Sequence, residues 1–439
     1  MKLGKVLLCI AASPFALLAG VAHAQDESIS GGLNTSAADL FARNRNVSVR
    51  ERPHPEYEAL GLRAGSFLIY PRLEAAVESN DNIYATETNE QSDTIWRLSP
   101  SVNLISNWSR HSLQAYARGS FTRYADFDEE NADDFELGAR GRVDIQRFFE
   151  VNLEGSHARL TEPRVAQNTP DAAEAPIEYD LDRARIGARK TFNRIRVGGD
   201  FAYDKYDYDD GRTIGTATSP SVVIDQDNRD REVMEISGRV DYAVSPDTAV
   251  FVQVSHNTRA YDIASTPLVA ARDSDGYEVL AGADFEVSRL VRGDAAVGYL
   301  SQDFEDVRFQ DIDGFGARMK LEWFPTQLTT VTGNVSRVVE DSVVIGAGGF
   351  LSTTASLQVD HEFMRNVILT GQVSYASDDF EGVDRKDDRW LGALSGTYLL
   401  NRYVGVGLTY SYFDQGSEGL DRGREFTVQK VALSLVLQR

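Results

Sequence analysis

The sequence predicts an all-β fold, a transmembrane antiparallel up-and-down β-barrel of about 18 strands. Three observations predict this class of fold. Runs of residues alternate between an apolar and a polar face, the connections between the runs alternate between short turns and long acidic loops, and the chain starts with a segment that has the composition of a secretory leader.

The first 24 residues predict a cleavable signal peptide, residues 1–24. Lys2 and Lys5 form a short basic region, residues 6–19 are mostly apolar, and Ala22-His23-Ala24 has small residues at the positions that a signal peptidase reads. The only cysteine of the sequence, Cys9, lies in this segment. A lipoprotein is the less favoured alternative, because a leucine and not a small residue precedes Cys9. Disulfides, thiolate metal sites and cysteine catalysis are therefore excluded from the predicted mature chain.

The composition excludes one class of partner and leaves two classes of protein. The 439 residues carry 67 Asp and Glu against 45 Lys and Arg, for a net charge of −22 at pH 7. Such a chain repels the phosphates of nucleic acid, so no nucleic-acid partner is expected. Beyond the predicted signal peptide, no stretch approaches the ~18 consecutive apolar residues of a spanning helix. A large soluble β-protein and a barrel with a polar lumen remain.

Alternation along the chain favours a barrel. In the last segment, Val431, Leu433, Leu435 and Leu437 share one face, and smaller or polar residues occupy most of the other. Such a period of two is typical of a strand with one buried face. Similar runs are predicted to start near residues 67, 93, 111, 134, 150, 180, 195, 230, 248, 274, 291, 310, 328, 350, 366, 388, 402 and 423.

The connections between these runs fall into two kinds that alternate. One kind is short, such as QRFFE, FNRIR and LNRY, and the other is long and acidic, such as DFDEENADD and residues 209–229. Short periplasmic turns and long extracellular loops are typical of outer-membrane barrels. The sequence therefore predicts that residues 64–439 form a barrel in the cell outer membrane, with acidic loops that divalent ions bridge to lipopolysaccharide and an apolar face in contact with lipid.

Aromatic residues lie near the predicted strand ends. Trp96, Trp323, Trp390 and Tyr84 are such residues, and Tyr410 and Tyr412 lie towards the loop end of their strand. We interpret them as girdles at the two membrane interfaces. The alternative is that they form the core of a soluble protein.

Residues 25–63 differ from the rest in being polar and poor in strand formers, with a Pro-x-Pro sequence. They predict a flexible periplasmic segment. The alternative is a plug that enters the lumen, or an arm that docks on a periplasmic partner.

No catalytic or metal-binding set is predicted, and no cofactor. The histidines lie outside any GxSxG or HExxH arrangement. Ser255, His256 and Asp262 are near one another in sequence, but serines beside histidines are common by chance. The acidic run 126–134 lacks the glycine and the closing glutamate of a calcium loop. The chain is therefore not expected to be an enzyme.

The face opposite the apolar one is charged, and we expect it to line a pore. Its basic residues are Arg97, Arg118, Arg140, Arg142, Arg183, Arg185, Arg189 and Arg196, and its acidic residues are Glu235, Asp241, Glu278, Asp284, Glu286 and Asp294. A basic wall that faces an acidic wall would create a transverse field that selects polar solutes. In the alternative, these charges pair with one another and fill the barrel.

Four segments resemble a β-barrel porin family of Gram-negative bacteria. They are residues 52–57 (RPHPEY), 61–67 (GLRAGSF), 80–84 (NDNIY) and 108–111 (WSRH). Members of that family are often encoded beside capsule and exopolysaccharide export systems. The resemblance implies an outer-membrane exit for a polysaccharide, with the barrel assembly machinery and a periplasmic polysaccharide export protein as partners.

Two other functions remain open from the residues alone. One is a general diffusion porin for small polar solutes, and the other is a closed structural barrel. A porin needs a constriction loop that folds inward, and residues 163–179 and 209–229, the two longest loops, are the candidates.

Overall fold

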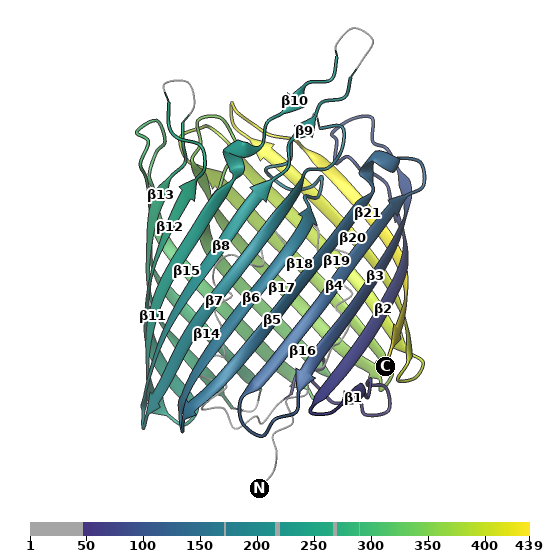
Figure 1. Cartoon of the computed structure of the whole chain (residues 1–439), viewed down its shortest axis with the longest axis vertical. Helices are drawn as coiled ribbons and strands as arrows, with labels where there is room; N and C mark the ends of the chain where they lie inside the picture. The colour runs from purple at the N-terminus through teal and green to yellow at the C-terminus, as the bar shows by residue number, and fades with distance from the viewer. Residues whose placement is uncertain (1–46, 171–172, 216–219, 267–269, 289) are drawn as a thin grey trace.

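The computed structural model describes residues 47–439 except 171–172, 216–219, 267–269 and 289. The predicted signal peptide and residues 25–46 lie outside the described residues. In the described chain, eighteen long antiparallel strands form one closed barrel (Figure 1). They are β2 (Phe67–Asn80), β3 (Asp93–Ser106), β4 (Ser112–Tyr124), β5 (Ala132–Gln146), β6 (Phe149–Thr161), β7 (Glu178–Phe192), β8 (Ile195–Tyr208), β11 (Arg231–Ser245), β12 (Thr248–Tyr261), β13 (Ser274–Val287), β14 (Val291–Phe304), β15 (Ile312–Thr326), β16 (Thr329–Asp341), β17 (Gly349–Met364), β18 (Val367–Phe380), β19 (Lys386–Leu399), β20 (Val404–Glu418) and β21 (Phe426–Gln438).

The predicted strands are confirmed in number and in place. Every predicted start lies within three residues of an observed one. Three short strands were not predicted. They are β1 (Leu62–Ala64), which pairs with the start of β2, and β9 (Gly211–Arg212) and β10 (Val223–Ile224), which pair with each other outside the barrel. Within the part of the chain that the structure describes, the loops contain the 3-10 turns η3 (Asp128–Glu130) and η4 (Asp227–Arg229).

The barrel closes where its first and last long strands meet. β2 pairs with β3 on one side and with β21 on the other, and Leu73 is opposite Leu437 in that second register. Lipid supplies no hydrogen-bond partner, so each backbone N–H and C=O of a spanning sheet needs a partner in the sheet itself. The pairing of β2 with β21 removes the two edges that an open sheet would expose.

Short turns and long loops lie at opposite ends of the barrel, as the sequence predicts. The connections at one end have two to five residues, while those at the other have five to twenty-two. Several short turns hold a residue in the left-handed region, with φ of 63° at His111, 64° at Phe148 and 53° at Asn193. A left-handed residue next to a bulge reverses the chain within a tight hairpin, and the register shifts between Asp144 and Gln146 at the turn that contains Phe148.

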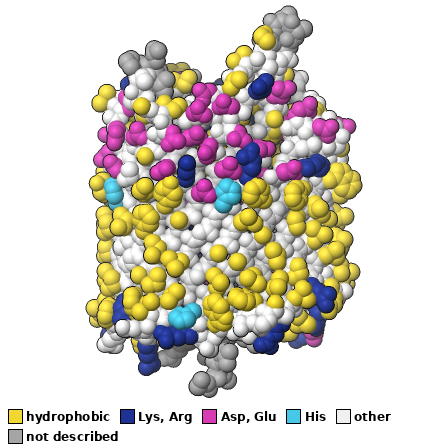
Figure 2. Space-filling model, in the orientation of Figure 1, with side chains coloured by type: hydrophobic (Ala, Val, Ile, Leu, Met, Phe, Trp, Pro, Cys, Tyr) yellow, Lys and Arg dark blue, Asp and Glu magenta, His cyan; other side chains and the backbone are white. Residues whose placement is uncertain are grey.

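On the face of the barrel in Figure 2, a belt of apolar side chains lies between two charged rims. Asp and Glu gather in a band at the loop end, and Lys and Arg are prominent at the turn end. Trp96, Trp323 and Trp390 lie near strand ends and are about half exposed, at 58%, 46% and 49%. These positions agree with the predicted interface girdles.

The prediction that Tyr84 belongs to an interface girdle is wrong. It lies in the loop after β2, where its ring meets Phe127 edge-on and the guanidinium of Arg164 lies over it. The loop contacts occupy this ring, so it does not contribute to an interface with lipid.

The described residues contain no helix that is both long and apolar enough to cross a membrane.

Replacing an outward leucine at mid-height tests the predicted lipid face. Leu433 lies in the middle of β21, is 56% exposed and is opposite Leu408. We expect Leu433→Arg to lower the free energy of unfolding in lipid vesicles by about 2–4 kcal/mol, because a cation at the bilayer midplane loses its hydration. Urea titration measures this effect. Leu420→Arg, at a loop residue that is 91% exposed, is the matched control and should change the value little. An equal loss in both variants would contradict the orientation.

Candidate functional site

The predicted pore-lining residues all lie on the inward faces of their strands. Along β3 to β8 and β11 to β14, the exposed apolar side chains alternate with these charged ones. Trp96 and Leu98 flank Arg97, for example, and Tyr277 and Val279 flank Glu278. Because successive side chains of a strand point to opposite faces, the charged residues face the interior.

Most of the predicted basic residues have a carboxylate nearby on the same or the next strand. The pairs are Arg97–Glu78 (3.4 Å), Arg118–Glu136 (3.4 Å), Arg140–Glu154 (2.8 Å), Arg142–Asp144 (3.4 Å), Arg183–Asp204 (3.9 Å), Arg185–Asp204 (3.6 Å) and Arg196–Asp241 (2.9 Å). Arg189 has an electrostatic contact with Asp200. Neighbouring carboxylates therefore offset the positive charges along the whole of the predicted basic wall.

The predicted acidic residues lie beside the basic ones and not across from them. Consecutive strands are neighbours in an up-and-down barrel, so the basic arc from β3 to β8 adjoins the acidic arc from β11 to β14. At the junction, Asp241 accepts hydrogen bonds from Arg196 and from Arg239, each at 2.9 Å. Arg239 also donates to Asp284 at 2.8 Å. Further along the acidic arc, Arg318 pairs with Glu278 at 3.4 Å.

Glu235, Glu286 and Asp294 complete the acidic arc. The carboxylates of Glu235 and Asp294 are close enough to the guanidinium of Arg318 for electrostatic attraction. One oxygen of Glu286 is buried without a hydrogen-bond partner. The interior of the barrel therefore holds many charges of both signs in close proximity, as the pairing alternative expects.

A cavity of about 800 Å³ occupies the interior towards the loop end. Its wall includes inward residues of the predicted basic arc together with residues 162–168 of the loop between β6 and β7. Of its charged lining residues, eleven are Arg or Lys and eight are Asp or Glu. The surface that a solute meets in this cavity is therefore richer in cations than the chain as a whole, whose net charge is −22.

The loop between β6 and β7 folds into the barrel directly after the end of β6. Arg164 is buried there and forms two hydrogen bonds to Glu130, at 2.5 and 3.0 Å. The next residue, Val165, is 7% exposed and packs in an apolar cluster with Ala85, Phe413, Phe426 and Val428. Removal of these apolar groups from water stabilises the inward position of the loop.

The same loop reaches the far wall of the barrel. Gln167 donates to Asp378 on β18 at 3.0 Å, and Asn168 donates to the carbonyl of Asp341 at the end of β16 at 3.1 Å. In a ring of eighteen strands, β16 and β18 lie eight positions from β6. The loop therefore crosses almost the full width of the lumen.

Arg424, in the loop between β20 and β21, binds the inward loop. Its guanidinium donates to the carbonyls of Arg164 and Ala166, at 3.0 and 3.4 Å. Backbone carbonyls that enter an interior need such donors, because a buried carbonyl without a partner costs free energy. Of the two predicted constriction loops, residues 163–179 thus fold inward over the part that the structure describes.

The other predicted constriction loop, residues 209–229, takes the opposite course. Its two short strands β9 and β10 form a hairpin that projects beyond the rim (Figure 1). Among its described residues, Arg229 at its end lines the cavity but the hairpin does not, so the prediction that this loop forms an inward constriction is wrong. The hairpin is a small sheet of its own, so its backbone groups find partners without entering the lumen.

A cluster of tyrosines and arginines on the cavity wall was not predicted. Tyr179 stacks on Tyr208 at 4.9 Å, and the guanidinium of Arg229 lies 4.0 Å from the centre of the Tyr208 ring. Arg231 lies 4.1 Å from the ring centre of Tyr206. Such contacts are favourable because the ring face is electron-rich. These residues lie in loops and at strand ends, where alternation gives no signal, so only the fold brings them together.

The one catalytic set considered from the sequence does not assemble. Ser255 and His256 are neighbours on β12 and point to opposite faces, since Ser255 is buried while the ring of His256 stacks on the exposed Tyr277 at 4.5 Å. In the acidic run 126–134, Glu130 is bound to Arg164, and Asp133 pairs with Arg123 at 2.6 Å.

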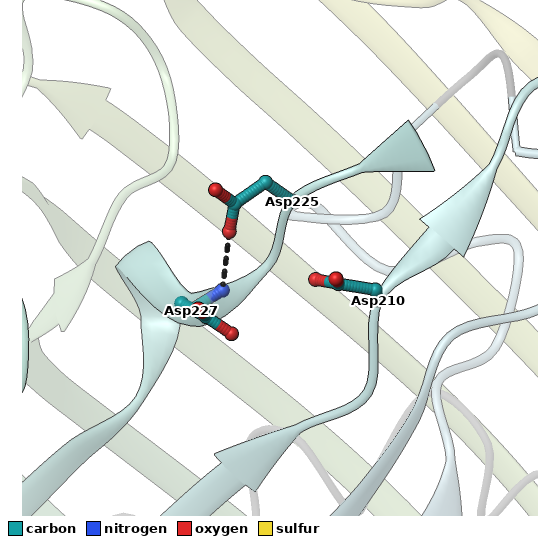
Figure 3. A group of neighbouring side chains, drawn as sticks. All are labelled: Asp210, Asp225 and Asp227. Carbon is teal, nitrogen blue, oxygen red and sulfur yellow. Dashed lines mark hydrogen bonds between the residues drawn. The ribbon is translucent and has the colours of Figure 1, made fainter. Parts of the chain in front are cut away.

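Among the described residues, one group of three acids lies close enough together to hold a metal ion. Asp210, Asp225 and Asp227 lie at the base of the outer hairpin (Figure 3). Each has a carboxylate oxygen within 4.8 Å of the others. The carboxylates of Asp225 and Asp210 raise the pKa of Asp227, as expected for like charges in proximity. All three side chains are exposed, and the backbone N–H of Asp227 already donates to Asp225. Exposed acidic groups of this kind are common without an ion.

Comparison with known proteins gives one family and a set of similar folds. A family described as "Putative beta-barrel porin 2" matches residues 54–439. A search of the curated proteins finds no match. Among solved structures, OccAB4 of Acinetobacter baumannii covers 88% of this chain and 100% of its own length, at 10% identity and a TM-score of 0.45. OpdL of Pseudomonas aeruginosa covers 85% and 99%, at 12% identity and 0.44. A BenF-like porin of Pseudomonas fluorescens Pf-5 covers 84% and 99%, at 10% identity and 0.45.

Removing the carboxylate at the junction of the two arcs should destabilise the barrel. The side chains of Asp241 and Arg196 are 2% and 4% exposed. Asp241→Asn leaves the buried guanidinium of Arg196 without the carboxylate that it binds, whereas Arg239 keeps Asp284, so we expect a loss of about 3–5 kcal/mol in the free energy of unfolding. The exposed pair Arg123–Asp133 is the control, and Asp133→Asn should cost less than about 1 kcal/mol. Urea unfolding from lipid vesicles measures both, and equal losses would show that the interior pair is not buried in the folded barrel.

Proposed function

The chain belongs to the family described as "Putative beta-barrel porin 2" and is an outer-membrane β-barrel, and on that premise we propose that it conducts polar solutes past the inward loop between β6 and β7. The fold and the family point to a channel and not to an enzyme. A barrel of eighteen strands is wide enough to enclose an aqueous passage. Its lining of Arg, Asp and Glu favours water and polar solutes over apolar ones.

The observation that carries the proposal is the course of the loop across the lumen. Val165 and Asn168 lie only three residues apart, yet one packs against β20 and β21 and the other bonds to the end of β16. A segment in this place divides the lumen and limits the size of what passes. A closed structural barrel has no need of such a loop, because side chains alone can fill a lumen.

The resemblance of residues 52–57 and 61–67 to a family found beside polysaccharide export systems supports a finer proposal about the cargo. In that proposal, a capsule or exopolysaccharide chain leaves the cell through this barrel. A polymer has a cross-section that stays constant along its length, so the inward loop would have to leave the far wall during export. The contacts of Gln167 and Asn168 are the ones that would have to break.

Shortening the loop tests whether it limits conduction. We expect deletion of residues 164–170 to raise the single-channel conductance in planar bilayers several-fold, because the segment that crosses the lumen is lost. Deletion of residues 220–224, which include β10 of the outer hairpin, shortens the chain outside the lumen and should leave the conductance unchanged. An unchanged conductance after the first deletion would reject the loop as the constriction, and no conductance in any of the three proteins would indicate a closed barrel.

A deletion of the gene separates the two kinds of cargo. Loss of surface polysaccharide with unchanged uptake of small sugars is expected if the barrel exports a polymer. Slower uptake with normal surface polysaccharide is expected for a diffusion porin. The two phenotypes are measured in one strain, with the wild-type gene supplied on a plasmid as the control.

A further inference from the structure

The chain segment that precedes the barrel, residues 47–58, lies inside the periplasmic mouth. We call it the strap. Val49 in the strap is fully buried, and its backbone N–H donates to the hydroxyl of Thr330 on β16 at 2.9 Å. Thr330 is opposite Asp360 in the register of β16 and β17. Both are inward residues, since Val359 and Phe363 on the alternate face of β17 are exposed.

Two arginines of the strap bind carboxylates of the inner wall. Arg50 donates to Asp360 at 2.9 Å, and Arg52 donates to Glu362 at 2.7 Å, both on β17. Asp360 also accepts hydrogen bonds from Thr370 and Gln358, at 2.7 and 2.6 Å. The wall therefore holds this carboxylate in place independently of the strap, and the strap binds to a site that is already formed.

The contacts of the strap span a wide arc of the mouth, from β14 through β16 and β17 to β21. At one end, the carbonyl of Tyr57 accepts a hydrogen bond from Gln438, the last residue of β21. Nearer the start of the strap, between Arg50 and Arg52, Glu51 pairs with Arg292 on β14 at 3.0 Å. These two strands lie seven positions apart in a ring of eighteen. A segment that lines this arc from the inside narrows the mouth.

We propose that the strap is an autoinhibitory element that closes the periplasmic end of the channel and opens it when the strap leaves the inner wall. The inner lumen then has two restrictions in series, the loop between β6 and β7 at the extracellular end and the strap at the periplasmic end. The proposal requires that the barrel conducts, but it does not depend on the nature of the cargo.

The contacts of the strap suit a reversible element better than those of the loop do. Arg50 and Arg52 keep 27% and 25% of their side chains exposed, whereas Arg164 of the loop keeps 7%. A guanidinium that is partly hydrated loses less on leaving its carboxylate than a buried one does. The segment also contains Pro53 and Pro55, which limit its flexibility and prevent it from pairing as a strand of the sheet.

Neutralising the two arginines of the strap tests the proposal. We expect the double variant Arg50→Gln and Arg52→Gln to raise the conductance or the open probability in planar bilayers several-fold. The wall keeps all of its residues, and Asp360 keeps its hydrogen bonds from Thr370 and Gln358. Arg63→Gln, an exposed position in β1 outside the strap, is the matched control and should behave as the wild type.

The same comparison is made in the protein that lacks residues 164–170, so that the extracellular loop cannot hide an effect. If that protein conducts and the strap variant adds nothing to its conductance, the proposal is wrong. If neither protein conducts, the failure lies with the proposed function of the whole barrel and the strap has no channel to close, which also overturns the proposal.

A cysteine pair gives a second and independent measurement. Val49→Cys with Thr330→Cys joins the strap to the wall, and the only native cysteine is Cys9 of the predicted signal peptide. Oxidation should hold the channel at low conductance, and reduction should return it to the wild-type level. Equal conductance in the oxidised and reduced states, or failure of the pair to form in the folded protein, would show that the strap does not close the mouth.

Discussion

The structure depends on the requirement that every backbone N–H and C=O in the apolar region has a partner within the protein. Lipid offers none, and an open sheet would leave two edges unpaired. The pairing of β2 with β21 satisfies this requirement and turns the sheet into a barrel. Once the sheet is closed, the alternation of side chains determines the rest, because one face of every strand must meet lipid and the other must meet the interior.

Closure also explains the arrangement of the interior charges. Sequential strands become neighbours, so charges that are close in sequence remain close in space and pair locally, as Arg140 and Glu154 do. Where two arcs of opposite sign meet, Arg196, Asp241 and Arg239 form one connected group. A buried carboxylate with two guanidinium partners is tolerated because the mutual attraction compensates for the water that each group has lost. Charge pairing thus supplies rigidity in an interior that has little continuous apolar core.

The parts of the chain that are not needed for the wall occupy its two ends. At the extracellular end, Val165 anchors the loop between β6 and β7 in an apolar cluster, and Arg424 satisfies its carbonyls. At the periplasmic end, the segment that contains Arg50 and Arg52 binds the inner face of β17. In both elements, backbone groups inside the lumen have hydrogen-bond partners, such as the carbonyl of Arg164 and the N–H of Val49, which is the condition for placing irregular backbone inside a barrel.

The sequence by itself determined the class of fold, the eighteen strands and the orientation of their faces. Alternation with a period of two is a local property that each strand carries in its own residues, as in the segment from Val431 to Leu437. The fourteen inward charged residues followed from the same alternation. Only the tertiary structure decided which of the two long loops enters the lumen, and that Tyr179 and Tyr208 stack beside Arg229. These features arise from contacts between residues far apart in the chain, such as Asn168 and Asp341, for which a single sequence contains no periodic signal.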